Sequence, residues 1–256
     1  MEIVELIYKS YPAFIFIFIR TTLILLSAPF FGVKGIPSAV KIGLSLMIAV
    51  LLLPVVKPVD IPLNFFAWVP AILSEVLIGA AIGFMARVVM AGVELAGQIV
   101  GFQMGFGIVN IIDPHTNNQV SIIATFQGIL AMLLFFTVNA HHYFISAIAV
   151  SLKTVPPFSA LISGGVISTL VSLSGGLFVT ALKLGAPVMA ALLFANVAMG
   201  VIARTVPQVN IFMMGFPVTI AVGLIVIGIS MPVLVVFIQK LMVGMERDIF
   251  TLLKAM

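Results

Sequence analysis

The side chains that could do chemistry in this sequence are few, and most stand alone inside apolar runs. A charged or amide group in such a run must face protein or water, because lipid cannot satisfy it. Lone groups of this kind are typical of membrane helices that bind other helices or line an aqueous path. We expect Lys183 to reach the membrane surface or to pair with a carboxylate such as Glu75. The embedded polar residues are Arg20, Glu75, Arg87, Glu94, Gln98 and Lys183.

The usual catalytic sets are absent from the sequence. There is no cysteine, no His-Glu-x-x-His motif and no phosphate-binding glycine loop ending in Lys-Ser or Lys-Thr. His141 and His142 are adjacent, so on a helix they would point about 100° apart and could not bind one metal ion from one face. We predict no catalytic residue, metal ligand or cofactor. For the histidines we predict a role at a helix end or at the membrane interface.

The composition indicates an integral membrane protein. Of 256 residues, 62% are hydrophobic and 8% charged, whereas soluble domains are about 45–50% apolar and about 25% charged. At about 20 residues per crossing, the apolar residues suffice for about seven or eight helices. The net charge of +4 comes from scattered basic residues, so no nucleic-acid partner is expected.

Two apolar runs are too long to cross a bilayer once. Val120 to Leu152 would extend about 50 Å as a helix and Leu161 to Ala203 about 64 Å, against a hydrocarbon core of about 30 Å. Either each run folds back, near Asn139 to His142 in the first and near Gly175, Gly176 or Pro187 in the second, or much of its surface faces other proteins. Shorter runs are Pro12 to Phe31 and Ile42 to Val56. An amphipathic tail from Lys240 follows the last long run, Ile211 to Gln239.

A stripe of glycine and polar residues follows the run from Phe65. At 100° per residue, eight of these residues fall within about 100° of arc. Glycines four residues apart let a second backbone approach closely. Arg87 and Glu94 are too far apart to pair, so each needs a partner elsewhere or an aqueous lumen, and Gly92 could break the helix. The stripe consists of Gly79, Gly83, Arg87, Glu94, Gly97, Gln98, Gly101 and Gly105.

An unusually apolar segment follows the stripe. It runs from Gly105 to the Asp113-Pro114 turn. Loops are normally polar, so an apolar loop beside a polar stripe suggests a seal that closes a passage. The alternative is that Phe106 to Ile112 completes a membrane helix, and periodicity alone does not exclude it.

Several separated motifs, in order, resemble the FliR family of flagellar biosynthetic proteins, and the resemblance covers nearly the whole chain. They are Arg20 with Ala28 to Phe31, Pro37 to Lys41, Glu94 to Phe106 with Asp113-Pro114, Asn139 to Phe144, and Arg204 to Pro217.

The resemblance implies an all-α polytopic membrane protein of long bent helical hairpins. It would be one export-gate domain over residues 1–256, with a FliP-like front fused to a FliQ-like back. The expected partners are FliP and FliQ, the export components FlhA and FlhB, and unfolded flagellar subunits. The expected location is the bacterial inner membrane, in the flagellar basal body.

The family's plug loop matches Phe106 to Asn118. In this interpretation apolar side chains occlude a lumen, Gly105 and Gly107 let the loop swing, and Arg87, Glu94 and Gln98 hold the supporting helix to neighbouring chains. The competing hypothesis is a secondary transporter or ion channel, which would also carry intramembrane Arg and Glu. The predicted plug comprises Phe106, Gly107, Ile108, Val109, Asn110, Ile111, Ile112, Asp113 and Pro114.

Overall fold

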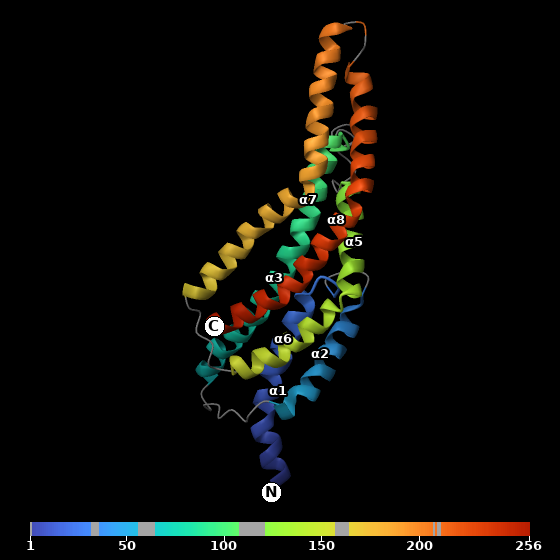
Figure 1. The fold of residues 1–256 in the computed structure, drawn as a ribbon. Helices are drawn as coiled ribbons and strands as arrows, with labels where there is room; N and C mark the ends of the chain where they lie inside the picture. The colour runs from blue at the N-terminus through green and yellow to red at the C-terminus, as the bar shows by residue number, and fades with distance from the viewer. Residues whose placement is uncertain are drawn as a thin grey trace. The chain divides into compact units, whose positions relative to one another are not determined.

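The fold is all-α, as predicted (Figure 1). A computed structural model describes residues 2–31, 36–55, 65–107, 121–156, 164–206, 208 and 211–256, and no strand occurs in those ranges. The helices are α1 (Glu2–Ser27), α2 (Ser38–Leu52), α3 (Phe65–Met104), α5 (Ile122–Thr137), α6 (Ala140–Thr154), α7 (Gly164–Thr205) and α8 (Ile211–Ala255), with a short 3-10 helix η1 (Leu53–Val55) after α2.

Fewer helices can cross a membrane than the apolar content would allow. Among the described residues, α3, α7 and α8 are long and apolar enough, and α5 with α6 adds a fourth if the broken pair is one span. The apolar residues are concentrated in helices of 40, 42 and 45 residues, each about twice the length that one crossing needs.

The two over-long runs behave differently. The first breaks where expected, between α5 and α6, where Asn139 takes a left-handed φ of 55°. The second does not fold back, so of the two alternatives the hairpin near Gly175, Gly176 or Pro187 is wrong. α7 continues through Pro187, since a proline in an apolar helix removes one backbone hydrogen bond without ending the helix. The tail from Lys240 likewise continues α8.

Gly92 does not break α3, which corrects the prediction that it could. The helix is continuous from Phe65 to Met104. A Cβ atom at Gly92 would lie 3.2 Å from the Cγ2 of Thr180 on α7. The glycine therefore serves helix packing, where its missing side chain allows a close approach.

The chain forms two compact units. Unit 1 comprises residues 1–89, 135–174 and 242–256, and unit 2 comprises residues 90–134 and 175–241. The core of unit 1 includes Phe16, Ile17 and Ile24 of α1. The core of unit 2 contains Val100, Met104, Ile123, Val188, Leu192 and Ile227. That residues 1–256 act as one export-gate domain stays a prediction.

Candidate functional site

A buried ion pair lies in unit 1. The Nε and Nη2 of Arg20, on α1, donate to the two carboxylate oxygens of Glu75, on α3, over 2.5 and 2.8 Å. Neither residue is exposed at all. The remaining nitrogen, Nη1, donates to the carbonyl oxygen of Val155 over 2.9 Å and to the Ser151 hydroxyl over 3.4 Å.

The geometry of this pair explains how a charge tolerates an apolar interior. The planar guanidinium matches the carboxylate in a two-bond arrangement, which is the strong form of such pairs. Its third side is satisfied by the end of α6. A buried pair adds little net stability, but removing one partner leaves an uncompensated charge. The pair therefore holds α1, α3 and the end of α6 in one register.

Arg87 has a different role. Its side chain is exposed, and its Nε and Nη2 donate to the carbonyl oxygens of Ser27 and Leu26 over 3.2 and 3.4 Å. These carbonyls are at the C-terminal end of α1, where the last helical C=O groups have no partner within the helix and cations are favoured. Arg87 thus caps α1 of its own unit.

The other embedded polar side chains are exposed. Glu94 and Gln98 on α3 are exposed, and so is Lys183 on α7. The prediction that Lys183 pairs with Glu75 is wrong, because both carboxylate oxygens of Glu75 accept from Arg20. Glu94 lies against α5, where a Cβ at Gly128 would be 3.6 Å from its Oε1.

The glycines of the stripe lie against neighbouring helices in both units. In unit 1, a Cβ at Gly79 would be 2.7 Å from the Cβ of Leu23, and one at Gly83 would overlap Ser27, so α1 packs directly on α3. In unit 2, a Cβ at Gly97 would be 2.5 Å from the Cα of Ala124, and one at Gly101 would overlap the Ser121 hydroxyl.

The contacts of Gly97 matter most, because the obstructing atoms belong to the backbone. Ala124 Cα and N would lie 2.5 and 2.8 Å from the added atom, and no side-chain rotation can relieve that. The residues that meet α3 here are small: Ser121, which precedes α5, and Ala124 of α5. Sequence reasoning placed the glycines on one face but did not identify this partner.

The end of α3 is fixed by contacts within unit 2. α3 ends at Met104, and Gly107 is again helical. The alternative in which Phe106 to Ile112 completes a membrane helix stays untested, because Ile108 to Ile112 lie outside the described residues. Gly105 has a φ of 99°, a left-handed conformation that glycine adopts without a Cβ penalty. Its Cβ position would be 2.5 Å from the Phe216 ring. Of the predicted plug, Phe106 and Gly107 are described, whereas Ile108 to Pro114 lie outside the described residues.

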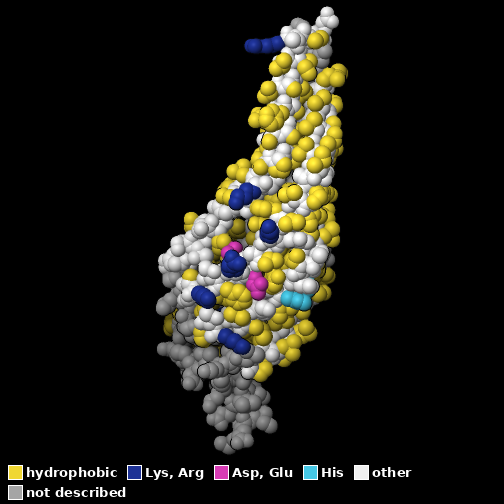
Figure 2. All heavy atoms as spheres, in the orientation of Figure 1, with side chains coloured by type: hydrophobic (Ala, Val, Ile, Leu, Met, Phe, Trp, Pro, Cys, Tyr) yellow, Lys and Arg dark blue, Asp and Glu magenta, His cyan; other side chains and the backbone are white. Residues whose placement is uncertain are grey.

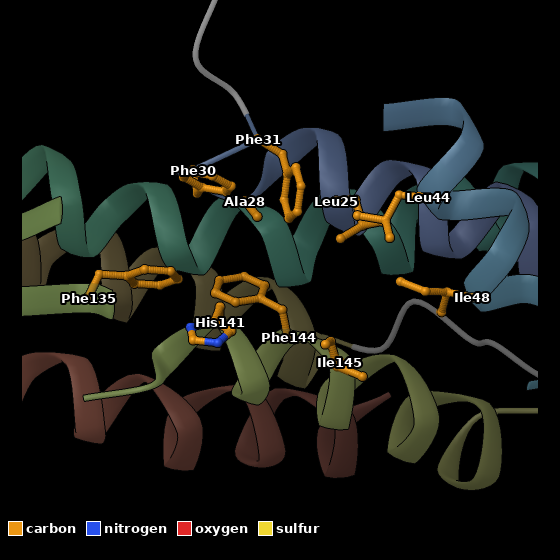
Figure 3. A pocket seen from close by; sticks show the side chains of 10 residues that line it. All are labelled: Leu25, Ala28, Phe30, Phe31, Leu44, Ile48, Phe135, His141, Phe144 and Ile145. Atoms are coloured by element: carbon orange, nitrogen blue, oxygen red, sulfur yellow. The ribbon is translucent and has the colours of Figure 1, made fainter. Parts of the chain in front are cut away.

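Unit 1 contains an apolar cavity near the histidines. Its volume is about 100 Å³, and Figure 3 shows the rings of Phe30, Phe31, Phe135 and Phe144 around it. His141 is the one ionisable residue among its lining side chains. Both histidines lie in the first turn of α6, at a helix end as predicted. Within the described ranges no group of three His, Asp or Glu could hold a metal ion.

A large apolar surface of α7 and α8 is uncovered. Only 11% of the most apolar stretch of α7 and 17% of that of α8 are buried, against 61% for α3. Figure 2 shows hydrophobic side chains covering the face of unit 2 that α7 and α8 form. Its large exposed members include Phe178, Leu193, Phe194, Val201, Ile225, Ile229 and Val233.

These features define a polytopic all-α membrane protein with conspicuous polar and glycine contacts between its helices. A family profile described as bacterial export proteins, family 1, matches residues 11–245. The flagellar biosynthetic protein FliR of Bacillus subtilis is 33% identical over 238 residues, 91% of this chain and 92% of its own length. The Escherichia coli K12 protein of the same name is 32% identical over 236 residues, covering 92% and 88%. FliR of Pectobacterium carotovorum is 33% identical, covering 88% and 86%.

The chain belongs to the FliR family of bacterial export proteins. The resemblance found in the sequence motifs is thereby confirmed, and with it a membrane-protein role in flagellar biosynthesis and export. The family match does not test the roles predicted for individual residues, which stay predictions.

The ion pair predicts a strong asymmetry between single and double substitutions. Glu75→Leu should destabilise the protein by about 3–5 kcal/mol, because it leaves the Arg20 guanidinium buried without its carboxylate. The double variant Arg20→Met/Glu75→Leu should recover most of that loss. The readout is the thermal unfolding of the detergent-purified protein. Ser151→Ala is the control, because it removes the 3.4 Å contact with Arg20 and the 2.8 Å bond to the Ile148 carbonyl but leaves the ion pair intact. An unchanged midpoint for Glu75→Leu would contradict the assigned role.

The glycine contacts predict a position-dependent response to one methyl group. Gly97→Ala should lower the thermal midpoint and the yield of folded protein, because its Cβ would collide with the Ala124 backbone. Gly228→Ala on α8 is the matched control: nothing lies within 4 Å of its Cβ position, and alanine favours a helix by up to about 1 kcal/mol over glycine. Equal behaviour of the two variants would refute close packing at Gly97.

Proposed function

We propose that this protein is a subunit of the flagellar export gate of the bacterial inner membrane, at the flagellar basal body. In this proposal it assembles with FliP and FliQ into a channel for unfolded flagellar subunits and works beside FlhA and FlhB. It acts by packing and gating and catalyses no reaction.

The length of the exposed apolar helices carries this proposal. α7 and α8 have 42 and 45 residues, which corresponds to about 63 and 68 Å at 1.5 Å per residue, whereas the hydrocarbon core is about 30 Å thick. Their apolar surface is nearly unburied over the most hydrophobic stretches. Lipid can cover only part of such a length, so other apolar proteins are the natural partners for the rest.

The exposed polar groups of α3 support the same view. Glu94 and Gln98 are exposed within a helix that is apolar enough to span a membrane. Hydrocarbon cannot satisfy them. Contact with neighbouring subunits or with a water-filled lumen would satisfy them, as a channel-forming assembly requires.

The gate in this proposal is the apolar segment that follows α3. Its closing side chains are Ile108, Val109, Ile111 and Ile112, with Phe106 at its start. Burying an apolar side chain contributes about 1.5–3 kcal/mol, so five would resist opening by about 7–15 kcal/mol at most. That range suits a gate that stays shut until an export substrate or partner supplies alternative contacts.

Co-purification tests the assembly. Tagged protein extracted gently from a bacterial membrane should bring FliP and FliQ with it in fixed ratio. The chain expressed alone should aggregate once detergent is removed, because α7 and α8 would then lack their partners. A stable, monomeric chain that takes up solute in vesicles would instead support a transporter and overturn the proposal.

Ion leakage tests the gate. Removing residues 106–118 should leave the heteromer assembled but make the membrane leaky to small ions. Replacing Ile108, Val109, Ile111 and Ile112 together by serine should act similarly, because it removes the apolar seal at unchanged loop length. Asn117→Ser/Asn118→Ser in the same segment is the matched control and should stay sealed. An assembled, ion-tight deletion variant would count against the plug.

A further inference from the structure

We infer that the outer face of α8 around Gly228 and Pro232 docks a membrane helix of another subunit. That helix donates a neutral hydrogen bond, from a hydroxyl or amide side chain, to the carbonyl oxygen of Gly228. The inference rests on the proposed assembly, because the assembly supplies the second subunit. Both residues belong to one helix and to unit 2.

Pro232 removes the regular hydrogen-bond partner of Gly228. In an α-helix the carbonyl oxygen of one residue accepts from the N–H of the residue four positions later. For Gly228 that residue is Pro232, which has no N–H and whose ring crowds the same carbonyl. α8 nevertheless runs unbroken from Ile211 to Ala255. The Gly228 carbonyl oxygen is therefore an acceptor that lacks its regular helical donor.

Side chains of this protein do not replace the lost donor. The hydroxyl nearest along the chain, that of Ser230, donates to the carbonyl of Ile227 over 3.2 Å. Among the described residues no side chain donates to the carbonyl of Gly228. Neighbouring helices are one of the usual sources of a donor for a carbonyl that proline frees inside a membrane. A second subunit can supply such a helix here.

The Gly228 carbonyl belongs to the side of α8 that faces away from the core. Ile227 is part of the buried core cluster of unit 2. At 100° per residue, Gly228 lies about 100° from Ile227, Pro232 about 140° and Ile225 about 160°. These last three residues are exposed, and nothing lies within 4 Å of the Cβ position of Gly228. A second helix can therefore approach the backbone closely at this point.

The surroundings of the carbonyl select a neutral donor. Its large exposed neighbours on α8 are the hydrocarbon side chains Leu224, Ile225, Ile229 and Val233, and α8 has no charged residue before Lys240. Lipid tails offer no hydrogen-bond donor, and a cationic donor would lose its water without gaining a counter-charge. A hydroxyl or amide on an otherwise apolar helix satisfies the carbonyl and leaves the rest of the contact apolar.

A second exposed proline, in α7, provides a comparison. Pro187 removes the regular donor of the Lys183 carbonyl in the same way. Lys183 is exposed and charged, so its surroundings must include water or a charged partner. The carbonyl freed in α7 thus lies beside a polar group, whereas the carbonyl freed in α8 has hydrocarbon neighbours. Pro187 is therefore the matched control for Pro232.

Carbonyl NMR tests the hydrogen bond directly. With carbonyl-¹³C glycine and ¹⁵N isoleucine, only glycines followed by isoleucine give a correlated signal, and these include Gly128 and Gly228. Gly128 is the internal reference, because Met132 of the same helix carries an N–H. The Gly228 carbonyl carbon should move downfield, to the Gly128 position, when the detergent-purified chain is compared with the assembled complex. Pro232→Ala assigns the signal, because it gives the Gly228 carbonyl a helical donor.

Retention of the other subunits tests what the bond contributes. Pro232→Ala occupies the carbonyl from within α8, so affinity for the co-purifying subunits should fall by about two- to tenfold, the range for one net hydrogen bond. The thermal midpoint of the detergent-purified chain should not fall, because alanine suits a helix better than proline. Pro187→Ala should retain its partners as the wild type does. The measurement is the fraction of subunits that stay with the tagged chain on dilution.

Two results would overturn the docking. One is a Gly228 carbonyl signal at the same position in the isolated chain and in an intact heteromer, either bonded in both, by water or the chain's own backbone, or bonded in neither. The other is a Pro232→Ala variant that retains its partners as well as the wild type, or loses them no more than Pro187→Ala does. Failure to recover any heteromer would instead refute the proposed assembly, and the docking with it.

Discussion

The structure depends on how the apolar surface of its long helices is covered. A helix that presents hydrocarbon side chains over about 60 Å cannot be covered by a bilayer core of about 30 Å. The apolar surface of α3 is covered largely by the chain itself, because 61% of its most apolar stretch is buried. The most apolar stretches of α7 and α8 are only 11% and 17% buried, so most of their surface must lie against lipid or other proteins. The same constraint explains the small number of charges, since hydrocarbon provides a charge with no partner.

The charges show two solutions to that constraint. Arg20 and Glu75 satisfy one another and the end of α6 with no exposed surface, so this solution is complete within unit 1. Glu94, Gln98 and Lys183 are exposed, so their hydrogen-bond partners must be water or groups of another subunit. The buried ion pair holds helices of this chain together, and the exposed polar groups face outward. This division is expected of a subunit in a larger assembly.

Much of this could be predicted from the sequence, because composition and helical periodicity are local properties. They indicated a helical membrane protein and the glycine face of α3, and they offered the break near Asn139 as one of two alternatives. Periodicity identifies a face but not what covers it, so the pairing of Arg20 with Glu75 and the contact of Gly97 with Ala124 could not be found. Proline and glycine misled at Pro187 and Gly92, because apolar surroundings and helix packing tolerate both inside a helix.

The end of α3 shows how local and distant signals combine. Glycine after an apolar helix signals a helix ending by itself, whereas Thr219 lies 115 residues from Met104 and carries no such signal. Together these signals fix the last turn of α3, because the Gly105 and Phe106 amides and the Thr219 hydroxyl donate to the carbonyl oxygens of Phe102, Gly101 and Met104. A helix ending that is held both by its own backbone and by a distant helix leaves fewer carbonyl groups without a partner than the local sequence alone could satisfy.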